Sequence, residues 1–463
     1  MIVPSGLRAS DMTQELKTLF ELGAAKTIKL DRRWIPSEGA PVITVIGKYV
    51  TRGWTQWTQG FQYGNSLLCY DITDDDVLLS IGRGHTLKDM PEHLTHQGVH
   101  DHGFNTLSTY GQLYRMMLEG RIALDPWEQR FYELALKVSG AVQAARWTAL
   151  ADGLGFIHSF NGPQSLFIDT MRTLRVCGVS HVLGHALLGE QDKKINLLQR
   201  LVAHATTTAT YNIFYGVGQD RYDDPTLRGR TAHETLFNAT NGSYRAPSSQ
   251  QGYSPFSTWT RGLGWAMLGF AEQLEFISSF PESEFDCDGI PNRRVILDLL
   301  ERAAKATCDF YITQASASDG ICYWDTGAPL LYKLGDWNSR PADPFNQYEP
   351  VDSSASAIAA QGLIRLGVAL GDEGERYLQA GLGISETLLQ EPYLSTNPEH
   401  EGILLHTIYH HPNKWDYVPS ASKIPYGESC MWGDYHLLEL GFLLSRIGAG
   451  GYYTFFQNIE RVH

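Results

Sequence analysis

The chain has 463 residues, of which 43% are hydrophobic and 11% aromatic, and its 37 Lys and Arg against 51 Asp and Glu give a formal charge of −14 at pH 7. This acidic balance argues against a nucleic-acid-binding protein, which would need clustered basic residues. The 11 Trp, 23 Tyr and 19 Phe argue against disorder, because side chains of this kind bury a large core.

Three features bear on the compartment of the protein. The first 20 residues lack a basic region followed by an apolar run, so no signal peptide is expected. No apolar stretch of membrane-spanning length is expected either. The six cysteines lie far apart and form no CxxC pair, which favours free thiols over disulfides or a zinc site. We therefore expect a cytoplasmic protein that is not bound to a membrane.

Apolar periodicity predicts two kinds of helix. Amphipathic helices are expected at 126–142, 192–206 and 296–311. Helices that are apolar or small nearly all round are expected near 104–118, 169–188, 262–277, 353–370 and 434–447. Because a helix that is apolar on every side should be surrounded by protein, we predict an inner ring of buried helices inside an outer ring of half-exposed ones.

Strand signals are few, with Ile43–Val45 and Val77–Leu79 as short, isolated candidates. Residues 212–256 form a long, polar, helix-poor insertion, and no linker rich in Pro, Gly and Ser divides the chain. The prediction is an all-α toroid in a single domain, residues 31–463, with residues 1–30 as an N-terminal extension that packs on it.

Clusters of aromatic, Gly and polar residues mark the starts of the expected buried helices. The clusters are WTQGFQYG at 57–64, HDHGFN at 100–105, IDTM at 168–171, STWTRGLGW at 257–265, DSSASA at 352–357 and MWGDYH at 431–436. If these helices run parallel, their starts meet at one end of the toroid. Trp with carboxylates in one pocket favours carbohydrate chemistry, because indole faces cover sugar rings and carboxylates transfer the protons.

The four aspartates of these clusters have competing interpretations. Asp352 and Asp434 fit a structural role such as helix capping better than a role in chemistry. Capping alone is also an alternative for Asp101 and Asp169, before any family evidence is considered.

Other kinds of site have weak support. The histidines of HLTHQGVHDH lack the HExxH spacing of two ligands one helical turn apart, so no metal site is predicted. The acidic runs Asp74–Asp76 and Asp223–Asp224 are expected to be solvated surface. Neither a GxGxxG nor a P-loop pattern is present, and no serine lies in a GxSxG elbow.

Taken together, the motifs resemble the unsaturated glucuronyl hydrolases of glycoside hydrolase family 88. The matching segments, in the family's order over about residues 50–445, are WTQGFQYG, HDHGF, FIDTMRTL, QGYSPFSTWTRGLGWAMLGF, DSSASAIAAQGL and GESCMWGDYHLLE. The resemblance implies an (α/α)6 barrel. From the motifs, neither a cofactor nor a metal is expected. The resemblance also implies activity on lyase-generated oligosaccharides, which carry a 4,5-unsaturated uronic acid at the non-reducing end.

The resemblance assigns roles to particular residues. Asp169 matches the acid/base, which protonates C4 of the vinyl ether and then helps water to add at C5. Such a group needs a pKa raised toward neutrality. Asp101 matches a second essential aspartate, which contacts the substrate and keeps the Asp169 proton in place. Residues implied to bind the sugar or to wall the pocket are His233, Gln251, Trp259, Arg261, Trp57 and Trp265. Phe160 stands where the family often has Trp.

Three alternatives remain. One is the related unsaturated rhamnogalacturonyl hydrolase family, which shares the barrel and the chemistry. The second is an ordinary inverting glycosidase, with water held between two carboxylates. The third, an inactive sugar-binding protein, is disfavoured because both aspartates are present. The expected partner is an unsaturated uronic-acid oligosaccharide, derived by lyases from glycosaminoglycans or other polysaccharides. Neither nucleic acid nor a membrane is expected, and the protein is expected to be a monomer or homodimer.

Overall fold

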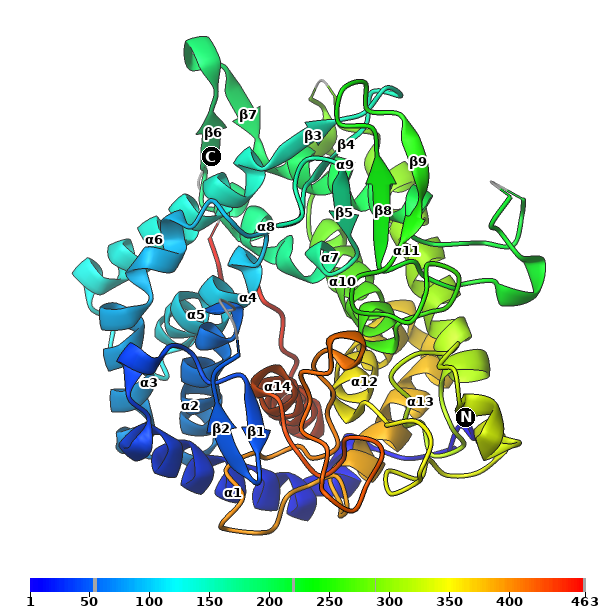
Figure 1. Ribbon diagram of the computed structural model, residues 1–463. Coiled ribbons are helices and arrows are strands. Elements are labelled where there is room, and N and C mark those ends of the chain that lie inside the picture. The colour runs from blue at the N-terminus through cyan, green and yellow to red at the C-terminus, as the bar shows by residue number, and fades with distance from the viewer. Residues whose placement is uncertain (53–55, 219–220, 288, 461–463) are drawn as a thin grey trace.

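The computed structural model describes residues 1–52, 56–218, 221–287 and 289–460, which form two concentric rings of helices. The inner ring is seen around the centre of Figure 1. Among the described residues it contains α2 (Gln59–Thr73), α4 (His102–Thr106) with α5 (Gln112–Leu118), α7 (Thr170–Thr173) with α8 (Arg175–Val182), α10 (Thr260–Ser278), α12 (Ser353–Leu370) and α14 (Met431–Gly448). The outer ring contains α1 (Thr13–Arg33), α3 (Asp76–Asp89), α6 (Pro126–Ala145), α9 (Leu197–Tyr211), α11 (Arg293–Phe310) and α13 (Glu375–Leu388).

Burial separates the two rings as the sequence predicts. Every residue of the inner helix α10 is buried except Glu275 and Ser278. The outer helix α11 buries only the face that carries residues such as Ile296, Leu300 and Ala303. All five predicted buried segments and all three predicted amphipathic segments contain a helix, and most boundaries shift by a few residues. The predictions at 169–188 and 192–206 are wrong at one end each, because Ala186–Leu188 and Lys194–Asn196 are strands that pair with each other. The sixth inner helix, α2, was marked only by its starting cluster.

Side-chain caps fix where several helices begin. The carboxylate of Asp125 accepts the backbone N–H groups of Trp127 and Glu128, with Pro126 as the first helical residue. Asp75 caps α3 by accepting the N–H of Val77. The strand prediction at Val77–Leu79 is therefore wrong, because this cap starts a helix there.

The strands are short and antiparallel. They pair as β1 (Ile43–Val45) with β2 (Lys48–Val50), β3 (Trp147–Ala149) with β4 (Gly155–Ile157), β6 (Ala186–Leu188) with β7 (Lys194–Asn196), and β5 (Ser165–Phe167) with β8 (Glu234–Phe237) and β9 (Tyr244–Ser248). The strand prediction at Ile43–Val45 is confirmed.

The predicted insertion at 212–256 lies in the connection between α9 and α10 and carries β8 and β9. Its strand β8 pairs with β5 so that Phe167 lies opposite Glu234, and the N–H of Ile168 donates to the carbonyl of His233 at 3.0 Å. This pairing brings His233 to the start of α7.

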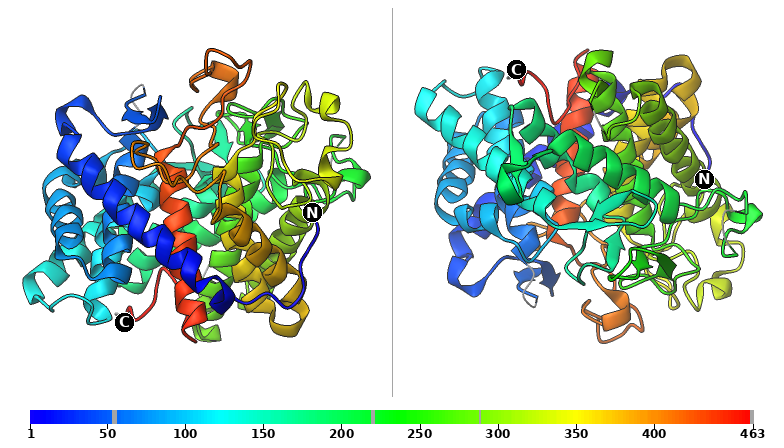
Figure 2. Two further views of the ribbon diagram at one scale, coloured as in Figure 1. Left: turned by 90° about the horizontal axis from the view of Figure 1, so that it is seen from below. Right: turned by 90° about the horizontal axis from the view of Figure 1, so that it is seen from above.

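The N-terminal segment contributes to the ring itself. Helix α1 crosses the predicted boundary at residue 30 and, running along the outside of the molecule, packs on α2 and α14. Side views show α1 beside α14, with the loop between α13 and α14 (orange) projecting from one end of the ring and the C-terminus at the other (Figure 2).

By length and composition alone, one described segment, Ser353–Leu388, could cross a membrane. The expectation that no stretch reaches this length is wrong in this case. Within the segment's most apolar window, 78% of the residues are buried inside the protein. An inner helix of the ring, α12, accounts for that burial, because it is enclosed by its neighbours.

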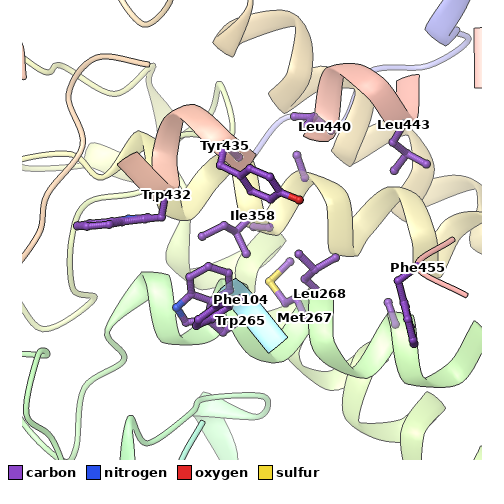
Figure 3. Close-up of a cluster of buried hydrophobic side chains, with 14 of the residues drawn as sticks. Phe104, Trp265, Met267, Leu268, Ile358, Trp432, Tyr435, Leu440, Leu443 and Phe455 are labelled. Carbon is purple, nitrogen blue, oxygen red and sulfur yellow. The ribbon is translucent and has the colours of Figure 1, made fainter. Parts of the chain in front are cut away.

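The centre of the ring is an apolar core with buried ion pairs. Figure 3 shows side chains from α4, α10, α12 and α14 converging there, among them Phe104, Trp265, Met267, Leu268, Ile358, Trp432 and Tyr435. Arg172 of α7 pairs with Glu272 of α10 and Glu439 of α14, and all three side chains are fully buried. Arg175 lies 3.6 Å from Glu439. These pairs connect α7, α8, α10 and α14.

Candidate active site

A cavity of about 240 Å³ lies where inner helices begin. It is lined by Trp57, His100, Asp101, Phe104, Phe160, Asp169, Gln250, Gln251, Trp259, Arg261, Trp265, Tyr409, His410, Asn413 and Trp415. Seven of the eight predicted site residues are among them. The eighth, His233, lies directly behind the cavity wall, beside Asp169.

Asp101 and Asp169 precede α4 and α7, and neither carboxylate caps its helix. Capping alone therefore does not explain them. The two helix starts approach closely at Gly103, where an added Cβ would lie 2.1 Å from the carbonyl oxygen of Thr173. Only glycine fits this contact, so Gly103 allows the two aspartates to face one cavity.

Both carboxyl groups are buried, with Asp101 9% and Asp169 8% exposed. Burial raises the pKa of Asp101 to about 7, opposed by the charge of Arg146. Burial also raises the pKa of Asp169 to about 7, with a further contribution from the charge of Asp101 and opposition from Arg261. Near neutral pH this pair can therefore hold and release a proton.

The other two aspartates are structural. The carboxylate of Asp352 accepts the N–H groups of Ser354 and Ala355 and pairs with Arg261 at 2.8 Å. Asp434 accepts the N–H groups of Ile403 and Leu404 at 2.9 and 2.8 Å. Neither residue lines the cavity.

The tautomer of His233 follows from its contacts. Its Nδ1 accepts the backbone N–H groups of Gln250 at 3.0 Å and Gln251 at 3.2 Å, so the proton of the neutral ring is on Nε2. Burial lowers the pKa of His233 to about 3, assisted by His410 and Arg261, which keeps the ring neutral. Nε2 lies 3.9 Å from Oδ1 of Asp169, and neither atom has a hydrogen-bond partner among the described residues.

Arg261 lines the cavity but is held from behind. Its Nη1 donates to Asp352 and to the carbonyl of Ile408, and its Nη2 donates to the carbonyl of Tyr409 at 2.6 Å and to Oε1 of Gln251 at 3.0 Å. Since an arginine can only donate, the contact fixes which end of the Gln251 amide faces it. Arg261 therefore positions Gln251, with the amide nitrogen as the end available to a ligand.

Aromatic rings form much of the cavity wall. Trp259 packs on His233 at 4.6 Å between ring centroids and under the guanidinium of Arg261. Trp57 stacks on Trp432 at 4.9 Å. Trp265 is 2% exposed and packs on Phe104. Trp57 and Trp265 thus contribute to packing as well as to the wall.

Phe160, the departure from the family pattern, still presents an aromatic ring. Its ring stacks on His100 with an interplanar angle of 28° and meets Phe167 edge to face. The aromatic surface on this side of the cavity is therefore kept, with phenyl in place of indole.

Sequence reasoning missed the contribution of the loop between α13 and α14. The segment 409–415 brings Tyr409, His410, Asn413 and Trp415 to the cavity. Asp416 holds it by accepting the N–H groups of Tyr409 at 2.5 Å and His410 at 3.0 Å. The only signal was a run of aromatic, His and Asn residues in a helix-poor stretch.

The histidines of the HLTHQGVHDH segment take separate positions. His93 bonds Gln59 at 2.7 Å, and His102 bonds Ser139 at 2.8 Å. Within the part of the chain that the structure describes, no group of three or more His, Cys, Asp or Glu could hold a metal ion. The acidic run at 223–224 is only partly surface, since Asp223 is buried and accepts the N–H groups of residues 216–218.

Two concentric helix rings, with a pair of buried carboxyl groups in an aromatic cavity, define an enzyme of the glycoside hydrolase type. No family model matches the chain. It is 27% identical over 418 residues to the unsaturated glucuronyl hydrolase of Bacillus sp. (strain GL1), covering 88% of this chain and 90% of the relative. It is 23% identical over 443 residues to the unsaturated chondroitin disaccharide hydrolase of Streptococcus pyogenes serotype M1, covering 94% and 91%.

Solved structures show the same fold. An unsaturated glucuronyl hydrolase specific for heparin superposes with a TM-score of 0.69 at 18% identity, covering 92% of this chain and 96% of the other. The unsaturated glucuronyl hydrolase from Bacillus sp. GL1 superposes with a TM-score of 0.67 at 21% identity, covering 94% of this chain and 99% of the other. The predicted α/α toroid is confirmed. The chain is similar to curated unsaturated glucuronyl hydrolases, which is consistent with glycoside hydrolase family 88.

Proposed function

We propose that this protein hydrolyses oligosaccharides that carry a 4,5-unsaturated uronic acid at the non-reducing end, by adding water across the C4=C5 bond. The observation that carries the proposal is the buried pair Asp101 and Asp169, each with its pKa raised to about 7. A group that acts first as an acid and then as a base works best with a pKa near the working pH. The names of the relatives support the same substrate class.

In the first step, protonated Asp169 donates its proton to C4 of the vinyl ether, which leaves a cation at C5 stabilised by the ring oxygen. A water molecule then forms a bond to C5 and returns a proton to the Asp169 carboxylate. The resulting hemiketal opens, and the bond to the leaving sugar breaks to release an open keto acid. The charge of Asp101 favours the protonated form of Asp169 before the reaction.

His233 can position the attacking water. One oxygen atom placed about 2.8 Å from each partner fits between atoms that lie 3.9 Å apart, as Nε2 of His233 and Oδ1 of Asp169 do. Water in this gap would accept a hydrogen bond from His233 and donate one to Asp169. That orientation directs its proton toward the base.

The cavity suits one terminal sugar ring. Its volume of about 240 Å³ lies below the ~300–1,000 Å³ of pockets that hold drug-sized ligands. Tryptophan faces cover the apolar side of a sugar, and the Gln251 amide can meet its hydroxyl or carboxylate groups.

One assay tests this proposal. The protein is incubated with unsaturated disaccharides from chondroitin, hyaluronan, heparin, gellan and pectin digests, and the ultraviolet absorbance of the C4=C5 bond is followed. We expect at least one substrate to lose this absorbance. Release of the second sugar with the absorbance intact would indicate an ordinary glycosidase. Loss with the pectin fragment alone would favour the rhamnogalacturonyl alternative.

A further inference from the structure

His100 stands apart from the other buried histidines of its segment. Both ring nitrogens of His93 and of His102 have protein partners. His100 is 1% exposed and lines the cavity, yet neither of its ring nitrogens has a hydrogen-bond partner among the described residues. Buried polar groups left unpaired are costly to folding, so those that persist call for an explanation.

Ring packing, rather than hydrogen bonding, holds His100 in place. Phe160 stacks on the imidazole at 6.0 Å between centroids, and Phe167 meets it edge to face at 5.5 Å. Burial lowers the pKa of His100 well below its ordinary value, with further lowering by Arg146 and neighbouring histidines. The ring is therefore neutral at neutral pH, with one N–H donor and one acceptor nitrogen.

The position of Nε2 relative to Asp101 shows what the ring can bind. It lies 3.9 Å from Oδ1 of Asp101, too far for a direct hydrogen bond. One oxygen atom about 2.8 Å from each would fit between them. A hydroxyl group is the matching ligand, because it can accept from Nε2–H and donate to the carboxylate at the same time.

We propose that His100 is a substrate-binding residue, which together with Asp101 holds one hydroxyl group of the terminal sugar. The inference rests on the proposed function for the identity of that sugar. The proposal assigns a hydrogen-bonding role to the neutral imidazole of His100, to which the sequence motifs gave no role. His100 is thereby distinguished from a residue that only packs between two phenyl rings.

The deciding variant is His100→Phe, which keeps an aromatic ring against Phe160 and Phe167 but removes both nitrogens. Binding of an unsaturated disaccharide is measured by calorimetry in an Asp169→Asn background, so that no turnover intervenes. We expect the Kd to rise roughly tenfold or more, because Asp101 loses the partner that shares its hydroxyl. The melting temperature should stay within about 2 °C of the parent value or increase.

Two further variants complete the experiment. His100→Gln places an amide near the position of Nε2 and should recover part of the affinity. His96→Ala removes an exposed side chain of the same segment and should leave the Kd unchanged. A Kd within about twofold of the parent for His100→Phe would overturn the proposal.

If His100→Phe does not fold, nitrogen NMR of His100 decides. Adding disaccharide to Asp169→Asn should shift the Nε2 resonance, and an unchanged resonance at saturation would refute the role.

Failure of the proposed function gives a different set of results from failure of the His100 proposal. Wild type that bleaches no disaccharide, while Asp169→Asn binds one and His100 responds, overturns the reaction but supports the site. Absence of any disaccharide binding by Asp169→Asn overturns both.

Discussion

Asp101 and Asp169 in the cavity and Glu439 in the centre of the ring are all buried, but the pKa values of the cavity pair and of Glu439 move in opposite directions. In the cavity, burial raises the pKa of Asp101 and of Asp169 to about 7. In the centre of the ring, burial acts the same way on Glu439, but Arg172 and Arg175 outweigh it and hold its pKa below the ordinary value. Burial alone therefore does not mark a site of chemistry. The cavity pair is marked instead by raised pKa values together with a place in the cavity wall, since structural Asp434 also has a raised pKa but does not line the cavity.

The strongest test of the cavity side of this comparison is Asp169→Asn. We expect loss of C4=C5 bleaching by roughly 10³-fold or more, because the acid and the base are one group. Disaccharide binding should survive, since the amide has nearly the shape of the carboxyl. Asp336→Asn, at an exposed aspartate that does not line the cavity, serves as the control. Normal loss of C4=C5 absorbance with Asp169→Asn would refute the assignment of Asp169 as the acid and base.

The matching test in the ring centre is Glu439→Gln. It leaves Arg172 and Arg175 buried with one carboxylate fewer, and we expect the free energy of unfolding in urea to fall by about 3–5 kcal/mol. Activity per folded molecule should be retained, because Glu439 does not line the cavity. Unchanged stability would show that these buried pairs do not support the ring.

The contribution of Asp101 and Asp169 to the stability of the folded protein should depend on pH. Raised pKa values mean that folded Asp101 and Asp169 bind more protons than the unfolded chain between about pH 4 and 7, so their contribution to stability falls as pH rises through this range. Asp169→Asn replaces one of the two titrating groups with a neutral amide, so the variant should lose less stability as pH rises. Its unfolding free energy should exceed that of wild type by about 2–4 kcal/mol at pH 8 and by much less at pH 4. Equal differences at the two pH values would contradict the raised pKa.

Asp101→Asn separates the two carboxyl groups. Because the charge of Asp101 raises the pKa of Asp169, its removal should move the alkaline limb of the kcat/KM profile to lower pH. Above pH 7, kcat/KM should fall roughly tenfold for each pKa unit lost. A limb that stays in place would mean that burial alone sets the pKa of Asp169.

The smallest effect is expected at Phe160. Replacing it with leucine removes the ring that stacks on His100 while keeping an apolar side chain. Phe160 also lines the cavity, so a ligand would lose an aromatic surface worth about 0.5–1.5 kcal/mol, and KM should rise roughly threefold to tenfold with kcat nearly unchanged. A fall in kcat with constant KM would show that Phe160 stabilises the transition state and not the bound substrate.

The rings and the identity of the aspartates could be predicted because their signals are local. Helices apolar on every side have one stable environment, and Asp101 and Asp169 lie in recognisable clusters at helix starts. The interpretation of Val77–Leu79 as a strand failed because the cap from Asp75 is stronger than the β preference of three residues.

Other parts of the site depend on contacts between distant segments. Arg261 is held by Asp352 and by carbonyls nearly 150 positions later in the chain, and no local pattern reveals that its donors are engaged. The segment 409–415 reaches the cavity only because Asp416 folds it back. The unpaired state of His100 likewise appears only when every neighbour is in place.

The pairing of β5 with β8 gives the site a modular construction. The strand that leads into Asp169 is bonded to the strand that follows His233, and His233 in turn fixes the backbone of Gln250 and Gln251. These polar groups therefore belong to one cassette between α9 and α10, separate from the ring that supplies the two acids. Exchanging this cassette between relatives would replace His233, Gln250 and Gln251 as a set and leave Asp101 and Asp169 in their original scaffold.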